Sequence, residues 1–483
     1  MKKIKKQACA YFFLCIVLLL TSCTTKGSVV IPETTSPILE EGSNETAENL
    51  GNNSHQLYEK ILSDRVDRDF GGRNFRIATD NKDLILSDNG ESLLGKEHYL
   101  RNAAIEKKYN VKIVLTEESG TSSIADRIKA EALAGNDYCD LILLESFHFQ
   151  NLAQADALIN VRSVPYLDVN ASFYNENSLK ATTLGNTSYG FAGDFIFNPD
   201  DVNVVFFNKT LLSQSSLPDL YSLVKNNQWD MDNFLLYSEE VFSLAQSNGA
   251  NVYGILSTKS AEELVKVFWA AAGMDFMKNE YGMRPELIYN NESTEAFIEQ
   301  FRNIFIRSVS YTAASTHESA IASFSNGGSL FLIASLATAP QLVGSGIDWG
   351  IVPIPKLDIN QKNYYSYIDS SYRLAGFSKG TSDLNFSGIL TSAFFACSED
   401  LNLRYSLQTY LNLYFSSPED ATIMKEVIDH PYYDPVEFFS QFDSSFTAAT
   451  QTVLYRAASG NSTLGALYNQ SIKMLNKYLD TIF

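Results

Sequence analysis

Cys23 is the residue whose chemical role the neighbouring sequence indicates most clearly. It ends a Leu-Thr-Ser-Cys sequence that matches the lipobox recognised by bacterial lipoprotein processing. Cleavage before Cys23 would free its amine, and a diacylglyceryl group on its sulfur would add about 0.8 kcal/mol of membrane binding per buried CH₂. Four lysines precede an apolar stretch at residues 8–20, which suits a signal peptide and is too short to span a bilayer. We predict a leader at residues 1–22 and lipidation at Cys23, with an ordinary signal peptide as the alternative.

Carboxylates are the residues with the greatest scope for catalysis. A glycosidase needs two carboxyl groups roughly 5 to 9.5 Å apart, and Glu145, Asp194 and Asp201 could supply such a pair. The chain has no Gly-x-Ser-x-Gly, His-Glu-x-x-His or Cys-x-x-Cys sequence and no phosphate-binding glycine loop. Its five histidines are scattered, without the spacing of metal ligands. We predict no enzyme, no metal site and no cofactor, and a glycan-active enzyme is the less favoured alternative.

The charge balance excludes several kinds of partner. The net charge is −19, and phosphate binding needs clustered Lys and Arg, so nucleic acid is not expected. A second, electrostatic contact with an anionic membrane is excluded by the same argument. Outside the leader and the lipobox, two cysteines are left, Cys139 and Cys397. They could form a disulfide or remain as buried free thiols, and the fold does not depend on disulfides.

Residues 24–55 are rich in Ser, Thr, Asn, Glu and Gly, with few large apolar side chains. Such a segment cannot bury enough surface to offset its ordering entropy, so we expect a flexible tether. After it, strands and helices alternate by their hydrophobic periodicity. The strands expected in the first part are residues 72–79, 110–115 and 140–144, with helices at 98–109 and 124–133. This order predicts a parallel, doubly wound α/β lobe.

A second α/β unit follows, and from residue 382 the pattern is mainly helical. The strands expected in the second unit are residues 202–207, 252–255, 328–333 and 349–353. Its expected helices are residues 229–246, 261–272 and 294–308.

Several colinear stretches resemble family 1 of the extracellular solute-binding proteins, the maltose-binding type. Residues 203–211, an apolar strand followed by Phe-Asn-Lys, look like the strand and Tyr/Phe-Asn-Lys of that family. Leu-Pro-Asp at residues 217–219 and Trp-Asp at 229–230 are similar to the start of its next helix. Residues 104–111, 132–142 and 324–355 agree with further segments, and residues 360–365 resemble a poorly characterised clostridial-type branch. The resemblance covers about residues 73–478.

The resemblance implies a type II periplasmic-binding-protein-like fold, in which two doubly wound α/β lobes are joined by crossing hinge strands. The crossings are expected near residues 197–201 and 367–373. The implied boundaries are a lipidated tether at 23–56, lobe 1 at 57–199, lobe 2 at 200–368, a return to lobe 1 at 369–431, and C-terminal helices on lobe 2 at 432–483.

A cleft between such lobes binds ligand where strand carboxyl ends and helix N-termini face it. The predicted ligand-binding residues, taken from strand ends, both crossings and a proline-flanked turn, are Asp80, Asn81, Glu145, Phe147, His148, Asp194, Phe195, Asp201, Ser335, Asp369, Tyr372, Tyr432 and Tyr433. Carboxylates suit sugar hydroxyls, and aromatic faces suit a pyranose ring. Each of these residues could instead have a structural role. The phenylalanines could be core rings, the aspartates could belong to turns or helix caps, and the tyrosines could pack a turn. His148 could lie in a solvated loop.

The resemblance implies a monomeric solute-binding subunit of an ABC importer, held by its lipid alone on the extracellular face of a membrane, in a Gram-positive bacterium. Its partners would be a small solute, with a sugar or oligosaccharide favoured, and ABC permease subunits. Relatives often carry a sugar-stacking Trp after the strand that corresponds to residues 328–333, whereas residues 334–338 hold no aromatic. Transport is therefore better supported than sugar transport, and a sensing or adhesion lipoprotein on the same fold is the alternative.

Overall fold

The computed structural model describes residues 47–86, 93–116, 121–368, 372–481 and 483. Contacts place residues 50–483 in one compact unit. Cys23 and Asp369 lie outside the described residues. Within the described part of the chain, no helix combines the length and the apolar character that a membrane span requires.

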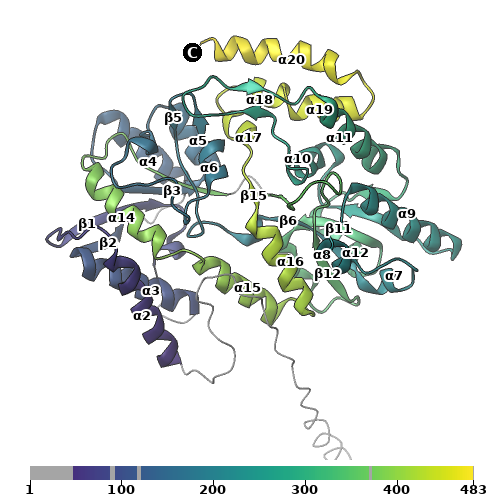
Figure 1. Ribbon diagram of the computed structural model, residues 1–483, viewed down its shortest axis with the longest axis horizontal. Helices are drawn as coiled ribbons and strands as arrows, with labels where there is room; N and C mark the ends of the chain where they lie inside the picture. The colour runs from purple at the N-terminus through teal and green to yellow at the C-terminus, as the bar shows by residue number, and fades with distance from the viewer. Residues whose placement is uncertain (1–46, 87–92, 117–120, 369–371, 482) are drawn as a thin grey trace, which may run out of the picture. The chain divides into compact units, whose positions relative to one another are not determined.

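The first sheet, sheet 1, has four strands in the order β14-β3-β1-β2 (Figure 1). Its strands are β1 (Arg73–Thr79), β2 (Val111–Leu115), β3 (Leu141–Glu145) and β14 (Arg373–Gly376). β1 pairs in parallel with β2 and β3, and helices α3 (Leu93–Tyr109) and α4 (Thr121–Ala134) connect them. The predicted strand-helix alternation is therefore confirmed. The sheet is not wholly parallel, because β14 pairs with β3 in the antiparallel direction.

The second sheet, sheet 2, has five strands in the order β10-β7-β11-β6-β12. Its strands are β6 (Asn203–Asn208), β7 (Tyr253–Ser257), β10 (Tyr311–Ala313), β11 (Ser329–Ser335) and β12 (Trp349–Pro353). β10, β7 and β11 are parallel, and β6 runs antiparallel to both β11 and β12. Four of these strands were predicted, and the short edge strand β10 was not.

Helices pack around sheet 1 and sheet 2 (Figure 1), and the strands β3, β6, β11 and β12 are almost wholly buried. The remaining longer helices are α5 (Ser146–Gln154), α9 (Met231–Ser247), α10 (Ala261–Ala271), α11 (Glu292–Arg302), α12 (His317–Ser325), α14 (Leu384–Ala396), α15 (Leu401–Leu413), α16 (Pro418–Asp429), α19 (Gln451–Ala458) and α20 (Leu464–Leu479). The short helices are α6 (Glu176–Ala181), α7 (Lys209–Ser213), α8 (Leu220–Lys225), α13 (Ala339–Leu342), α17 (Pro435–Phe439) and α18 (Ser445–Ala448). In sheet 2, Phe331 packs against Trp229 and Phe234 at the start of α9.

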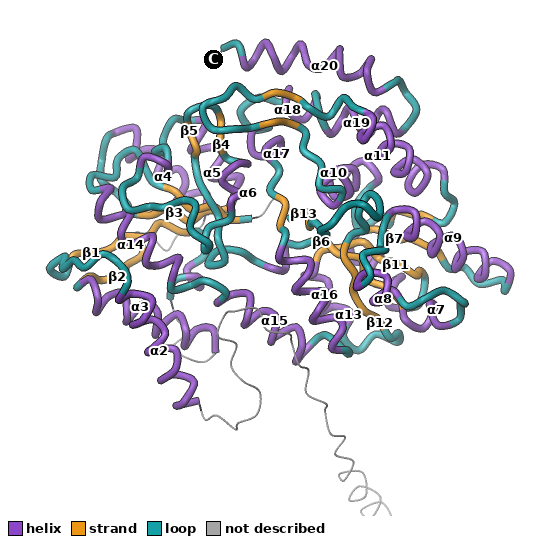
Figure 2. Tube along the Cα trace, viewed as in Figure 1, coloured by secondary structure: helices purple, strands orange, loops and turns teal. Residues whose placement is uncertain are grey.

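Two segments of chain connect the sheets, and they pair with the elements beside them. Phe191 lies antiparallel to Ala375 of β14, and the two backbones exchange hydrogen bonds of 3.0 and 2.7 Å. Val202, just before β6, forms an antiparallel bridge with Ile368 on the returning segment. The outgoing and returning segments therefore run side by side between the sheets. The short strand β13 (Ser366–Tyr367) belongs to the returning segment and pairs with β15 (Pro431–Tyr432) (Figure 2).

The last part of the predicted tether is helical, which corrects the expectation of a flexible coil. Helix α2 (Ala47–Ser63) begins inside residues 24–55. Its second half buries Tyr58 and Leu62, each 2% exposed. The Tyr58 hydroxyl also donates to Glu97 Oε2 at 2.8 Å. This packing compensates for a sequence that is mostly polar, because tertiary contacts stabilise helices more than intrinsic propensity does.

Cys139 and Cys397 are both free and buried. Of the two alternatives left open by the sequence, the structure supports buried thiols. Burial raises the pKa of Cys397 to about 12. Because the thiolate is the reactive form, we expect Cys397 to be inert at neutral pH.

An ion pair ties β1 to the start of β3. Arg76 donates through Nε to Asp140 Oδ2 at 2.9 Å and through Nη2 to Oδ1 at 2.8 Å. The Arg76 backbone N–H donates to the same carboxylate at 2.8 Å, and the Asp140 side chain is fully buried. The Asp140 carboxylate thus accepts hydrogen bonds from both the backbone and the side chain of Arg76.

Replacing Asp140 by alanine is expected to lower the free energy of unfolding by about 2 to 3 kcal/mol, because Arg76 keeps only Asp137 as a carboxylate partner and its backbone N–H loses its acceptor. The matched control is Glu59→Ala, which removes an exposed ion pair with Lys107 and should cost no more than about 1 kcal/mol. Urea unfolding of the two variants measures the difference, and equal losses would contradict the assignment.

Candidate functional site

The carboxyl edge of sheet 1 carries an ion cluster. Arg373, the first residue of β14, donates from Nε to Asp80 Oδ1 at 3.0 Å and from Nη2 to Glu145 Oε1 at 3.3 Å. The other oxygen of Asp80 accepts the backbone N–H of Glu145 at 2.7 Å. The Asp80 side chain is 1% exposed, whereas that of Glu145 is 38% exposed. Asp80 therefore fixes the strand ends, and Glu145 is the member of the cluster that a solute can reach.

The other predicted residues at this edge differ in their structural role and in their exposure. Asn81 caps the 3-10 turn Lys82–Leu84 by accepting the Asp83 N–H. Phe147 and His148 lie in the first turn of α5, with ring centroids 5.4 Å apart. Phe147 is half exposed, so it is not a core ring. Both line a shallow groove of about 440 Å³ with residues of α4.

A polar cavity of about 220 Å³ brings two predicted residues together. It is lined by Ser172, Tyr174, Asn175, Gly193, Asp194, Phe197, Asp400, Leu403, Ile428, Asp429, Pro431 and Tyr433. Asp194 comes from the outgoing segment, and Tyr433 comes from the turn after α16. The lining therefore joins residues 172–197 to residues 400–433, which are distant in the sequence. We call it the acidic cavity, since three aspartates and no basic side chain line it.

The electrostatics of the acidic cavity centre on Asp194. Its Oδ2 accepts the Asp400 backbone N–H at 3.1 Å. Burial raises the pKa of Asp194 to about 6, and the neighbouring negative charges of Asp400, Glu399 and Asp429 add to this effect. Burial also raises the pKa of Asp429. A hydrogen-bond donor or a cation entering the cavity would favour the charged form of these groups.

The predicted tyrosines are buried. Tyr372 and Tyr433 are each 5% exposed, and their rings meet edge to face at 5.1 Å. Burial raises the pKa of both phenols, and the Tyr372 hydroxyl has no hydrogen-bond partner among the described residues. Tyr432 donates its hydroxyl to the Met274 carbonyl at 3.3 Å. The turn thus packs tightly, and of these three tyrosines only Tyr433 lines the acidic cavity.

Phe195 belongs to the core, which corrects its prediction as a cleft residue. Its side chain is 1% exposed, and its ring packs edge to face on Phe394 at 4.8 Å and on Phe395 at 5.3 Å. The guanidinium of the buried Arg101 lies 5.0 Å from its centroid. Asp194 and Phe195 are neighbours in one turn, and their side chains enter different surroundings.

The carboxyl edge of sheet 2 presents small polar groups. Ser335 ends β11, opposite Asn203 of β6, and is partly exposed. Asp201 is the last residue of the 3-10 helix Pro199–Asp201 and is also partly exposed. Its neighbour Asp200 accepts the Tyr410 hydroxyl at 2.5 Å, which attaches this crossing to α15.

Sequence reasoning missed a second polar cluster beside β13. The Tyr367 hydroxyl donates to Glu437 Oε2 at 2.6 Å, and Lys266 Nζ lies 3.5 Å from Glu437 Oε1. Asp434 is buried nearby and accepts the Val436 N–H at 2.8 Å. Burial raises the pKa of Asp434 to about 7, and the negative charge of Glu437 contributes. The Pro-x-Glu sequence at the start of α17 was the only available signal, and it does not specify these partners.

In the part of the chain that the structure describes, no three His, Cys, Asp or Glu side chains form a group able to hold a metal ion.

Comparison with known proteins gives a family and a fold. A family model described as bacterial extracellular solute-binding protein matches residues 102–384. A search of curated proteins found no match. Among solved structures, the chain is similar to a family 1 extracellular solute-binding protein from Bifidobacterium longum subsp. infantis, with a TM-score of 0.52 and 12% sequence identity. The similarity covers 83% of this chain and 98% of that chain. At this identity the likeness concerns the fold.

The raised pKa of Asp194 predicts a pH-dependent stability difference. The folded protein holds this proton more tightly than the unfolded chain, so stability falls as the pH rises from about 4 to about 6. Asp194→Asn replaces the titratable carboxyl group by a neutral amide, whose oxygen can still accept the Asp400 N–H. Relative to this variant, the wild type should lose about 2 to 3 kcal/mol of unfolding free energy between pH 4 and pH 7. Urea unfolding at several pH values tests this, and Asp194→Glu, which keeps an ionisable group, should retain the fall.

Proposed function

Because the chain belongs to the bacterial extracellular solute-binding protein family, we propose that it is the receptor subunit of an ABC importer. In this role it captures a small solute outside the cell and delivers it to permease subunits. The observation that carries the proposal is the junction between the sheets: two connecting segments run side by side, and polar strand ends lie on both sides of them.

The junction suits a binding mechanism based on closure. Two sheets joined by a few extended segments can rotate relative to each other with small changes in backbone angles. A solute that contacts Glu145 at the edge of sheet 1 and Ser335 at the edge of sheet 2 would bind both only in the closed form. Ligand binding would then shift the population toward that form. The permease would recognise the closed form.

A carbohydrate is the solute class we favour. Carboxylate oxygens are strong acceptors for sugar hydroxyls, and the exposed part of Glu145 and the partly exposed Asp201 supply them. Residues 336–348, directly after β11, carry no aromatic ring. An aromatic contact would come from Tyr433, which lines the acidic cavity from the turn after α16.

The same carboxylates support capture without catalysis. Glu145 is bound to Arg373, and Asp194 accepts a backbone N–H. The proposal of capture without catalysis rests on the family of the chain, whose model is described as bacterial extracellular solute-binding protein. Incubation of the purified protein with glycans should release no reducing ends, and their release would contradict this reading.

Membrane attachment through Cys23 is part of the proposal. The Leu-Thr-Ser-Cys sequence places the thiol at the end of the apolar leader. A diacylglyceryl group with further acylation of the amine would give a lasting anchor. We expect Cys23→Ser to move the protein from the membrane fraction to the medium and to abolish labelling by a palmitate analogue. Ser22→Ala is the control, and it should remain in the membrane fraction. Retention of the Cys23→Ser protein in the membrane would contradict lipidation.

Solute capture is tested by thermal unfolding against panels of sugars, peptides and polyamines. A sugar at 100 times its Kd should stabilise the folded form by about 2.7 kcal/mol. Glu145→Gln should raise the Kd of that sugar about tenfold, because a charged acceptor becomes neutral while its contact to Arg373 can persist. The control is Asp83→Asn, on an exposed turn at the same end of sheet 1. Stabilisation by a peptide or polyamine alone would overturn the sugar assignment, and no response in any panel would remove the main support for solute capture.

A further inference from the structure

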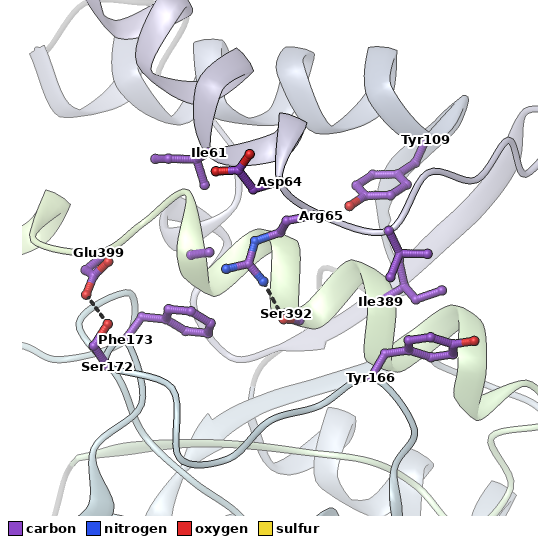
Figure 3. A pocket seen from close by; sticks show the side chains of 12 residues that line it. Ile61, Asp64, Arg65, Tyr109, Tyr166, Ser172, Phe173, Ile389, Ser392 and Glu399 are labelled. Atoms are coloured by element: carbon purple, nitrogen blue, oxygen red, sulfur yellow. Dashed lines mark hydrogen bonds between the residues drawn. The ribbon is translucent and has the colours of Figure 1, made fainter.

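A second groove lies on the sheet 1 side of the molecule, between the chain after α2, the loop before α6 and helix α14 (Figure 3). Its volume is about 540 Å³. The residues that line it are Ile61, Asp64, Arg65, Val66, Tyr109, Tyr166, Ser172, Phe173, Ile389, Ser392, Ala396 and Glu399. None of the predicted ligand-binding residues is among them, so the proposed solute site does not account for it. We call it the Arg65 groove.

Arg65 lies at the centre of the groove (Figure 3). Its Nη1 donates to Ser392 Oγ at 2.8 Å, and its guanidinium carbon lies 5.0 Å from the centroid of the Phe173 ring. Its Nε is covered and has no hydrogen-bond partner among the described residues. The protein therefore satisfies the guanidinium incompletely, and the side chain is partly exposed at the groove, where an oxyanion can pair with it.

Two tyrosines add to this observation. Tyr109 is fully buried, and its hydroxyl, which Figure 3 shows on the side nearer Arg65, also has no partner among the described residues. Tyr166 has a φ of 64°, a left-handed conformation that is unfavourable for a bulky residue. Its ring is 46% exposed at the rim. Strained backbone of this kind concentrates at binding sites.

The charges of the groove are arranged in two zones. Arg65 is the one basic side chain in the lining, whereas Asp64 and Glu399 are exposed acids at the rim. The Ser172 hydroxyl donates to Glu399 Oε1 at 2.7 Å and holds that carboxylate in place. Ile61 and Ile389 supply apolar surface between the zones. A simple anion would be repelled by the rim, and a simple cation would be repelled by the floor.

We propose that the Arg65 groove is a second ligand site, for a small zwitterion with an apolar body, such as an aromatic or branched α-amino acid. The carboxylate of the ligand pairs with the Arg65 guanidinium, for which planar oxyanions are the natural partners. Its ammonium group lies toward Asp64 and Glu399. The apolar side chain packs against Phe173, Ile389 and the exposed ring of Tyr166.

The Arg65 groove and the acidic cavity are neighbours but separate. Ser172 lines both, and its hydrogen bond to Glu399 lies at their boundary. Glu145 of the proposed solute site lines neither of them, so it can be changed without altering the Arg65 groove. Glu145→Gln provides this test of independence.

Isothermal titration calorimetry on the detergent-solubilised full chain tests the proposal with three probes. These are L-phenylalanine, phenylacetate, which lacks the ammonium group, and phenethylamine, which lacks the carboxylate. We expect L-phenylalanine to bind at least about tenfold more tightly than either of the other two, since each lacks one charged contact. Equal binding of phenylacetate would overturn the zwitterion assignment, and absence of L-phenylalanine binding at millimolar concentration would overturn the site.

Substitutions in and near the Arg65 groove test where L-phenylalanine binds. Arg65→Met should weaken L-phenylalanine at least about tenfold, and Glu399→Gln should weaken L-phenylalanine but leave phenylacetate unchanged. Arg68→Met, at an exposed arginine three residues away, is the matched control and should bind normally. Glu145→Gln should also bind normally, so a failure of the solute proposal leaves this one testable. If Arg65→Met unfolds, the Glu399→Gln result decides, and unchanged L-phenylalanine affinity there would contradict the proposal.

Discussion

The architecture depends on the return of the chain from sheet 2 into sheet 1. β14 becomes an edge strand beside β3, and its first residue, Arg373, neutralises Asp80 at the end of β1. On its other side, Ala375 pairs with Phe191 of the outgoing segment. One four-residue strand thus completes a sheet, satisfies a buried carboxylate and fixes both connections. The polar edge of sheet 1 has its geometry because β14 is there.

The distribution of charge separates structural from accessible acids. The chain has 56 acidic and 37 basic residues, and several of its carboxylates are buried against backbone donors. Asp140 and Asp80 are matched by arginines, which makes them structural. Burial raises the pKa values of Asp194 and Asp434 to about 6 and about 7. The junction between the sheets therefore holds the groups whose charge can respond to a ligand or to a modest change in pH.

Local patterns predicted much of the fold and less of the site. The parallel core of sheet 1 follows from periodicity in residues 72–144, where each strand and helix is continuous in sequence. Arg373 was not identified as a site residue, because its role arises from pairing with β3 over 228 residues. Helix α2 was missed because its stability comes from burying Tyr58 and Leu62 against distant elements. At the site, Asp194 and Tyr433 do line one cavity, whereas adjacent Phe195 is a core ring, a distinction of side-chain direction that the sequence does not carry.

The position of β14 also orders the events of folding. The hydrogen bond between Arg373 and Glu145 closes a loop of 228 residues, and Phe191 cannot find its partner before Ala375 is available. Contacts of such long range form late, since the entropy of loop closure is lost before any packing is gained. While a chain emerges N-terminus first, sheet 1 lacks its edge until nearly four-fifths of the polypeptide has appeared. Sheet 1 therefore gains its last strand only when residues 373–376 have been made or translocated, long after β1, β2 and β3 are available.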